Sequence, residues 1–108
     1  MDFNEYQAKA RKFAIYPKDN ILYPVLGLAS ETGEVADKFK KCIRDNNSDF
    51  NDIDFKESVK KELGDIIWYL GNIASDLGIC LDDIAVTNIN KLQFRKERGK
   101  LQGSGDDR

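Results

Sequence analysis

Apolar and polar residues recur at the three- and four-residue steps of amphipathic helices in four separate stretches of the chain. The pattern predicts helices over residues 2–14, 24–44, 55–77 and 82–98. A loop that contains both prolines separates the first two helices, and a polar stretch rich in Asn and Asp separates the second from the third. No stretch alternates with the period of a β-strand. We therefore expect an all-α, four-helix bundle-like protein.

Several residues predict where these helices begin and end. Gly78 and Gly99 follow the third and fourth helices and predict their C-terminal ends. Asp54, with Glu57 three residues later, predicts the N-cap of the third helix, and Asp82 predicts that of the fourth. Each helix is expected to turn its apolar face inward. Residues 1–108 are expected to form a single domain with a flexible tail at 103–108.

Two pairs of acidic residues lie at the edges of the apolar faces. Glu31 and Glu34 belong to LASETGEVADKFKK, and Glu62 and Asp65 belong to KKELGDIIWYL. Residues three apart share a helix face, and the short loop between the second and third helices favours antiparallel packing, so the two pairs are expected to face each other. Two carboxylates 4 Å apart repel by about 4 kcal/mol at an effective dielectric near 20, so four of them require protons or cations. The alternative is a solvated acidic face.

The composition restricts the chemistry that these residues can support. The chain contains no histidine, which excludes Ser-His-Asp and Cys-His nucleophilic designs and the Glu-x-x-His ligands of ferritin-like di-iron bundles. Cys42 and Cys80 lack a metal-binding spacing and are interpreted as reduced packing residues. A ligand set made only of oxygen favours Mg²⁺, with Mn²⁺ as a substitute. Since Mg²⁺ commonly takes substrate phosphates as further ligands, the acidic pairs indicate a phosphate-bearing substrate.

The net charge, the lengths of the apolar runs and the size of the chain limit the partners that the protein is expected to have. The net charge of -2 provides no broad basic field for a nucleic-acid polymer or an acidic membrane. No apolar run approaches the ~20 residues of a membrane span, and MDFNEYQ lacks signal-peptide character, so a cytoplasmic protein is expected. A domain of this size buries only about two-thirds of its surface, so association as a homodimer or homotetramer would help it.

The fourth helix carries a polar stripe. Asn88, Lys91 and Arg95 recur at steps of three and four in NINKLQFRKERG. An amide, an ammonium and a guanidinium in a row can bind a di- or triphosphate. The alternative is a solvated basic face.

Together these residues resemble the all-α nucleoside triphosphate pyrophosphohydrolases of the MazG-like kind. The hallmark of that family, ExxE on one helix and ExxD on the next, corresponds to ETGE at 31–34 and ELGD at 62–65. The flanking YPVLGLASETGEVADKFKK and the closing NINKL and GSGDDR match as well, so the likeness covers nearly the whole chain.

The resemblance implies hydrolysis of a (deoxy)nucleoside triphosphate to the monophosphate and pyrophosphate, with Mg²⁺ as cofactor. The implied metal ligands and catalytic residues are Glu31, Glu34, Glu62 and Asp65. Lys91 and Arg95 are expected to contact phosphates, with Asn88 assisting. The resemblance also implies dimers or tetramers with sites near subunit interfaces.

The expected reaction is attack of an activated water on the α-phosphorus, with pyrophosphate as the leaving group. Glu31, Glu34 and Glu62 are equal candidates for orienting or deprotonating that water. The candidates for binding the base or sugar are Tyr69, Trp68, Asn72 and Phe13, and for each of them plain packing is the alternative.

Two other functions fit the same residues. One is a metal-dependent hydrolase of a nucleotide diphosphate or an alarmone, and the other is a non-catalytic helical interaction module. The tail at 103–108 is expected to close over a nucleotide, because its glycines permit turns that present N–H groups to an anion. A frayed terminus is the alternative for this segment.

Overall fold

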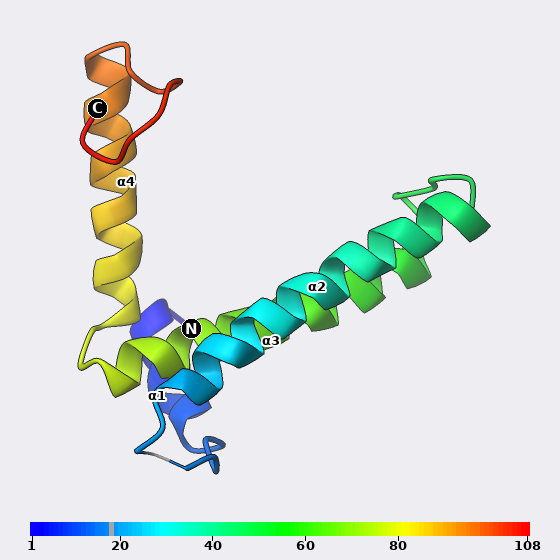
Figure 1. Ribbon diagram of the computed structural model, residues 1–108, viewed down its shortest axis with the longest axis horizontal. Coiled ribbons are helices and arrows are strands. Elements are labelled where there is room, and N and C mark those ends of the chain that lie inside the picture. Colours follow the sequence, from blue (N-terminus) through cyan, green and yellow to red (C-terminus); the bar gives the residue numbers. More distant parts are fainter. Residues whose placement is uncertain (18) are drawn as a thin grey trace.

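The computed structural model describes residues 1–17 and 19–108, and Lys18, within the first predicted loop, lies outside the described residues. Figure 1 shows its elements, which are α1 (Phe3–Arg11), α2 (Leu22–Asp45), α3 (Ile53–Asp76) and α4 (Leu81–Glu97). The described residues contain no strand, so the all-α prediction with four helices is confirmed. No helix in this part of the chain has the length and apolar character needed to cross a membrane.

The predicted helix ends at Gly78 and Gly99 are confirmed. Both glycines have positive φ angles, 70° and 68°, which other residues rarely adopt. The Gly99 amide donates to the Lys96 carbonyl at 3.1 Å, and the Lys100 amide donates to the Arg95 carbonyl at 2.7 Å. These are the two hydrogen bonds of a Schellman motif, which ends α4 and reverses the chain.

The predicted N-caps are wrong for both α3 and α4. The cap of α3 is Asp52, whose carboxylate accepts a hydrogen bond from the Phe55 amide at 3.0 Å, so the cap at Asp54 and its capping box do not form. The cap of α4 is Cys80, whose side chain makes no capping bond. Cys80 is also exposed, so its interpretation as a packing residue is wrong, whereas Cys42 is buried as expected.

Side chains of α1 cap α4 instead. The Gln7 amide oxygen accepts from the Leu81 amide at 2.7 Å, and the Asn4 amide oxygen accepts from the Asp82 amide at 3.2 Å. The first N–H groups of a helix have no partner within it, so these bonds across more than seventy residues satisfy them. They fix the start of α4 against α1.

Helices α2 and α3 form a long antiparallel hairpin, as predicted (Figure 1). At its tip, the rings of Phe39, Phe50 and Phe55 pack with centroids 5.0–5.6 Å apart. Near its other end, Gly27 lets α3 approach, because a Cβ at that position would overlap the Tyr69 ring. These two contacts, one near each end of the hairpin, fix how α2 and α3 are aligned along each other.

A buried polar network docks α1 and the following loop onto α3. The Arg11 guanidinium donates to the Asp76 carboxylate at 2.6 Å and to the Tyr16 hydroxyl at 2.9 Å, and the Tyr16 hydroxyl donates to Asp76 at 2.7 Å. The pKa of the Tyr16 phenol is raised, first by burial and then by its bond to Asp76. The side chains of Arg11, Tyr16 and Asp76 thus give one another hydrogen-bond partners, which buried polar groups need.

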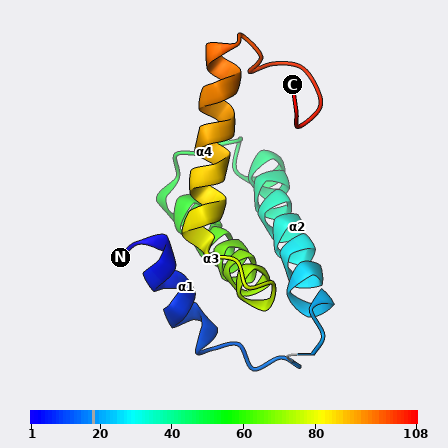
Figure 2. The same ribbon diagram turned by 90° about the vertical axis from the view of Figure 1, so that its left-hand side faces the viewer.

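Helix α4 leaves the hairpin at a steep angle and makes no contact with α2 in the described residues (Figures 1 and 2). The radius of gyration is 16.8 Å, whereas a compact domain of this length has about 13 Å. The expectation that each helix turns its apolar face inward is wrong for α4 within one chain, since Ile89 is 63% exposed and Ile84 and Leu92 are exposed as well. A large apolar surface is left uncovered.

Candidate active site

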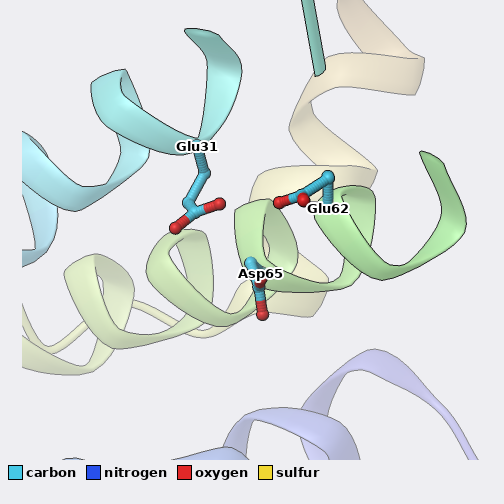
Figure 3. A group of neighbouring side chains, drawn as sticks. All are labelled: Glu31, Glu62 and Asp65. Carbon is cyan, nitrogen blue, oxygen red and sulfur yellow. The ribbon is translucent and has the colours of Figure 1, made fainter. Parts of the chain in front are cut away.

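Three of the four predicted acidic residues come together between α2 and α3. Glu31 on α2 and Glu62 and Asp65 on α3 each offer a carboxylate oxygen, and these oxygens lie within 4.8 Å of one another. Figure 3 shows the carboxylates of Glu31 and Glu62 directed toward each other, with Asp65 one turn further along α3. We call these three residues the acidic cluster.

The fourth residue, Glu34, does not join the acidic cluster in this conformation. Asp65 joins Glu62 at the same three-residue spacing on α3, but the Glu34 side chain does not reach the other carboxylates. Glu34 is exposed, yet its negative charge is one of the causes that raise the pKa of Glu31. Glu34 therefore lies at the rim of the acidic cluster.

The electrostatics of the acidic cluster favour an added positive charge. The pKa of Glu31 is raised, first by burial, then by a hydrogen bond with Glu62 and by the charges of Asp65, Glu62 and Glu34. A positive charge placed between Glu31 and Glu62 would relieve part of this repulsion. The Lys38 ammonium, 3.9 Å from a Glu62 oxygen, contributes a further positive charge at the edge.

The donor set fits a hard divalent cation. All donors are carboxylate oxygens, the preferred ligands of Mg²⁺ and Mn²⁺. At the ligand distance of Mg²⁺, about 2.0–2.1 Å, opposite oxygens of an octahedron lie about 4 Å apart and neighbouring ones about 3 Å apart. Oxygens within 4.8 Å of one another would therefore have to move closer by about 1–2 Å, through changes of rotamer, to share one ion. A bound cation would relieve the repulsion that contributes to the raised pKa of Glu31.

Two tyrosines lie beside the acidic cluster. The pKa of Tyr69 is raised by burial and then by the charges of Tyr23, Glu31 and Asp65. The pKa of Tyr6, on α1, is raised by burial and then by the charge of Asp65. The sequence predicted Tyr69 as a candidate contact, but Tyr6 was missed, because its helical period indicated only a core position.

Tyr6 also lines a cavity of about 370 Å³ with Phe3, Gly64 and Ile67. Gly64, the residue that precedes Asp65, is part of the wall that α3 contributes to this cavity, and Phe3 and Tyr6 form the wall from α1.

The other predicted base-binding residues are placed differently. Trp68 donates its indole N–H to the Ala10 carbonyl at 3.3 Å. Asn72 is 1% exposed, accepts from Arg11 at 3.1 Å and donates to the Trp68 carbonyl at 3.0 Å. Phe13 is exposed just after α1. Trp68 and Asn72 therefore hold α1 against α3.

The predicted phosphate-binding residues do not meet the acidic cluster in one chain. Lys91 and Arg95 lie in the last turns of α4, where they face the C-terminal tail, and Asn88 is exposed one turn earlier. Helix α4 makes no contact with α2 in the described residues, and its last turns stand apart from the α2–α3 hairpin (Figure 1).

The chain has no histidine, and three of its carboxylates converge between two antiparallel helices. These features place it among all-α proteins suited to bind a divalent cation through oxygen ligands. Within that class, the model of the MazG nucleotide pyrophosphohydrolase domain matches residues 22–99, so the chain belongs to the MazG family. The matched region includes the acidic cluster, Glu34 and the stripe on α4. The family assignment that the motifs indicated is confirmed.

Family membership supports a nucleotide pyrophosphohydrolase activity on a nucleotide substrate, and the members of the family typically depend on a divalent metal. The chain is also similar to the Gene 37 protein of Mycobacterium phage L5, with 38% identity over the full length of both chains. No solved structure matches the chain.

Proposed function

We propose that this protein is a Mg²⁺-dependent pyrophosphohydrolase that converts a nucleoside or deoxynucleoside triphosphate to the monophosphate and pyrophosphate, with Mn²⁺ as a substitute metal. The observation that carries the proposal is the convergence of Glu31, Glu62 and Asp65 in a chain of the MazG family. These three carboxylates hold the metal, and Glu34 joins them by a change of rotamer. Asp65 and the two glutamates supply only oxygen ligands, as Mg²⁺ requires.

The bound metal supplies Lewis-acid polarisation of the α-phosphoryl group and lowers the pKa of the attacking water. The carboxylates of the chain orient that water and accept its proton. Glu31, Glu34 and Glu62 are the candidates for this role. The raised pKa of Glu31 makes it a stronger base than an ordinary glutamate, which supports it for this role.

We propose that Tyr69 contacts the base or the sugar, because its ring lies beside the acidic cluster. Aromatic rings stack on any base, so this contact by itself does not select one nucleotide. Contacts from Trp68, Asn72 and Phe13 stay predictions, and Asn72 would first have to exchange its bonds to Arg11 and Trp68.

We propose further that the working enzyme is a homodimer or homotetramer of single-domain chains, in which α4 of one copy brings Lys91 and Arg95 to the acidic cluster of another. Three observations support it: the open shape, the missing contact between α2 and α4 in the described residues, and the exposed apolar residues of α3 and α4. A cavity of about 640 Å³ over Phe55, Leu63 and Ile67 adds apolar surface for a partner. Burying such surface stabilises an oligomer.

Pyrophosphate release from the eight common NTPs and dNTPs in the presence of Mg²⁺ tests the activity. Release of pyrophosphate, lost in Glu62→Gln, supports the proposal. Release of orthophosphate, or activity only on a diphosphate or an alarmone, supports the other hydrolase instead. A protein that hydrolyses none of these and whose melting temperature ignores Mg²⁺ and Mn²⁺ is an interaction module, because a metal that binds the folded state raises Tm by mass action.

Subunit mixing tests the shared site. Glu62→Gln and Arg95→Ala homo-oligomers are each expected to be inactive, and mixed oligomers are expected to regain activity, because one interface then carries both intact halves. Light scattering measures the mass of the oligomer. A monomeric, fully active protein would refute this arrangement.

A further inference from the structure

The C-terminal tail, residues 103–108, folds back along the end of α4 (Figures 1 and 2). Gly103 and Gly105 have φ angles of 120° and 90°, which other residues rarely adopt. The Arg108 guanidinium donates to the carbonyls of Lys100 at 3.1 Å and of Gly105 at 2.7 Å. The terminal arginine therefore closes this segment into a defined loop.

Asp106 of this loop lies at the cations of α4. The Arg95 guanidinium donates to the backbone carbonyls of Gly105, at 3.4 Å, and of Asp106. One carboxylate oxygen of Asp106 lies 3.6 Å from the same guanidinium and 3.5 Å from the Lys91 ammonium. An anionic oxygen thus already sits between the two residues that the proposed function assigns to the phosphate chain.

The site has unused capacity for an anion. The Arg95 side chain is 7% exposed, and its Nε finds no hydrogen-bond partner in the described part of the chain. A buried N–H of a charged group without a partner is costly and rare. Beside it is a cavity of about 250 Å³, and the charged residues that line it are Lys91, Arg95, Arg98, Arg108, Asp106 and Asp107. Four cationic side chains against two acidic ones favour a bound anion.

We propose that Asp106 is a built-in competitor for the anion site of α4: its carboxylate pairs with Lys91 and Arg95 in the free protein, and an incoming phosphate or pyrophosphate group displaces it. The proposal rests on the proposed function for the identity of the anion. The Asp106 side chain is 89% exposed, so its ion pairs are weak and easily exchanged. A pyrophosphate offers more oxygens, including one for the Arg95 Nε.

The exchange has a consequence for turnover. Because Asp106 is tethered to the site and returns whenever the anion leaves, it weakens the binding of pyrophosphate and favours its release. The carbonyl contacts of Arg95 keep the tail in place as a wall of the cavity during the exchange. Residues 103–108 therefore affect how tightly the phosphate groups of the ligand are bound.

Isothermal titration calorimetry with inorganic pyrophosphate, in a buffer without divalent metal, tests the competition. Asp106→Asn is expected to bind pyrophosphate about 3- to 10-fold more tightly than the unaltered protein, the gain from removing a weak ion pair. Asp107→Asn is the matched control, because it makes the same change in net charge but has no ion pair with Lys91 or Arg95 in the described residues. Its gain is expected to be clearly smaller.

Equal gains in both variants, no gain in Asp106→Asn, or no pyrophosphate binding in either the unaltered protein or this variant would each overturn the proposal. These measurements use neither metal nor hydrolysis. The competition and the hydrolase activity can therefore fail independently.

Discussion

Glu31→Gln is expected to stabilise the metal-free protein and to weaken its response to divalent metal. Gln keeps the size of the side chain and its hydrogen bond to Glu62, but it removes the charge that faces two other carboxylates. The two effects have opposite signs in the absence and presence of metal, so they identify a cation site more specifically than a loss of activity does.

The magnitude follows from the separation of the oxygens. At 4.8 Å, Coulomb's law gives about 3.5 kcal/mol per pair with an effective dielectric of 20 and about 0.9 kcal/mol in bulk water. Asp65 is exposed, so solvent screens its charge, and the two pairs together are expected to contribute about 1–2 kcal/mol. Each kcal/mol corresponds to a change in Tm of about 4–8 °C for a domain near this size.

Thermal melting with a chelator, and then with saturating Mg²⁺ or Mn²⁺ at matched ionic strength, measures both effects. A metal at 100 times its Kd stabilises the unaltered protein by about 2.7 kcal/mol, and Glu31→Gln is expected to lose most of that gain. Glu34→Gln is the control: it lies outside the acidic cluster, so its metal-free Tm is expected to stay close to that of the unaltered protein.

The reasoning is refuted if Glu31→Gln melts below the unaltered protein without metal, because the three carboxylates then do not repel each other as their distances indicate. An undiminished metal response in this variant would refute the assignment of Glu31 as a ligand.

Three further predictions follow. Glu34→Ala and Asp65→Ala are expected to abolish turnover with an unchanged far-UV circular dichroism spectrum, and full activity in Glu34→Ala would remove it from the metal ligands. Gly27→Ala is expected to lower the free energy of unfolding by about 1–3 kcal/mol, because the new methyl overlaps the Tyr69 ring; an unchanged urea midpoint would show that α2 and α3 are not held this close. Deleting residues 103–108 is expected to change KM and kcat, and unchanged values for both would exclude a role of the tail at the site.

Much of the helical structure was predictable because its causes are local. The three- and four-residue period defined the helices, and glycine is the residue that tolerates the left-handed conformation at Gly78 and Gly99. The start of α3 was less determined, since Asp52 and Asp54 are both chemically suitable caps. Only the backbone conformation at Asp52 decides between them.

The acidic cluster was predictable in part. The spacing of Glu62 and Asp65 on one helix, and the antiparallel hairpin, were enough to expect them near Glu31. The position of Glu34 depends on its rotamer and on the separation of α2 and α3 at that turn, and neither has a sequence signal. Tyr6 was missed because a residue on the inner face of α1 does not reveal which carboxylate it will meet.

The sequence by itself therefore determined the class of fold, the acidic pairs and the oxygen-only chemistry that follows from the absence of histidine. Only the tertiary structure decided the direction of α4, because the groups that fix its start, Gln7 and Asn4, are more than seventy residues away. It also decided that Arg95 faces Asp106 and not the acidic cluster. Hydrogen bonds and ion pairs between distant residues form after the chain has folded, so no local pattern of apolar and polar residues encodes their partners.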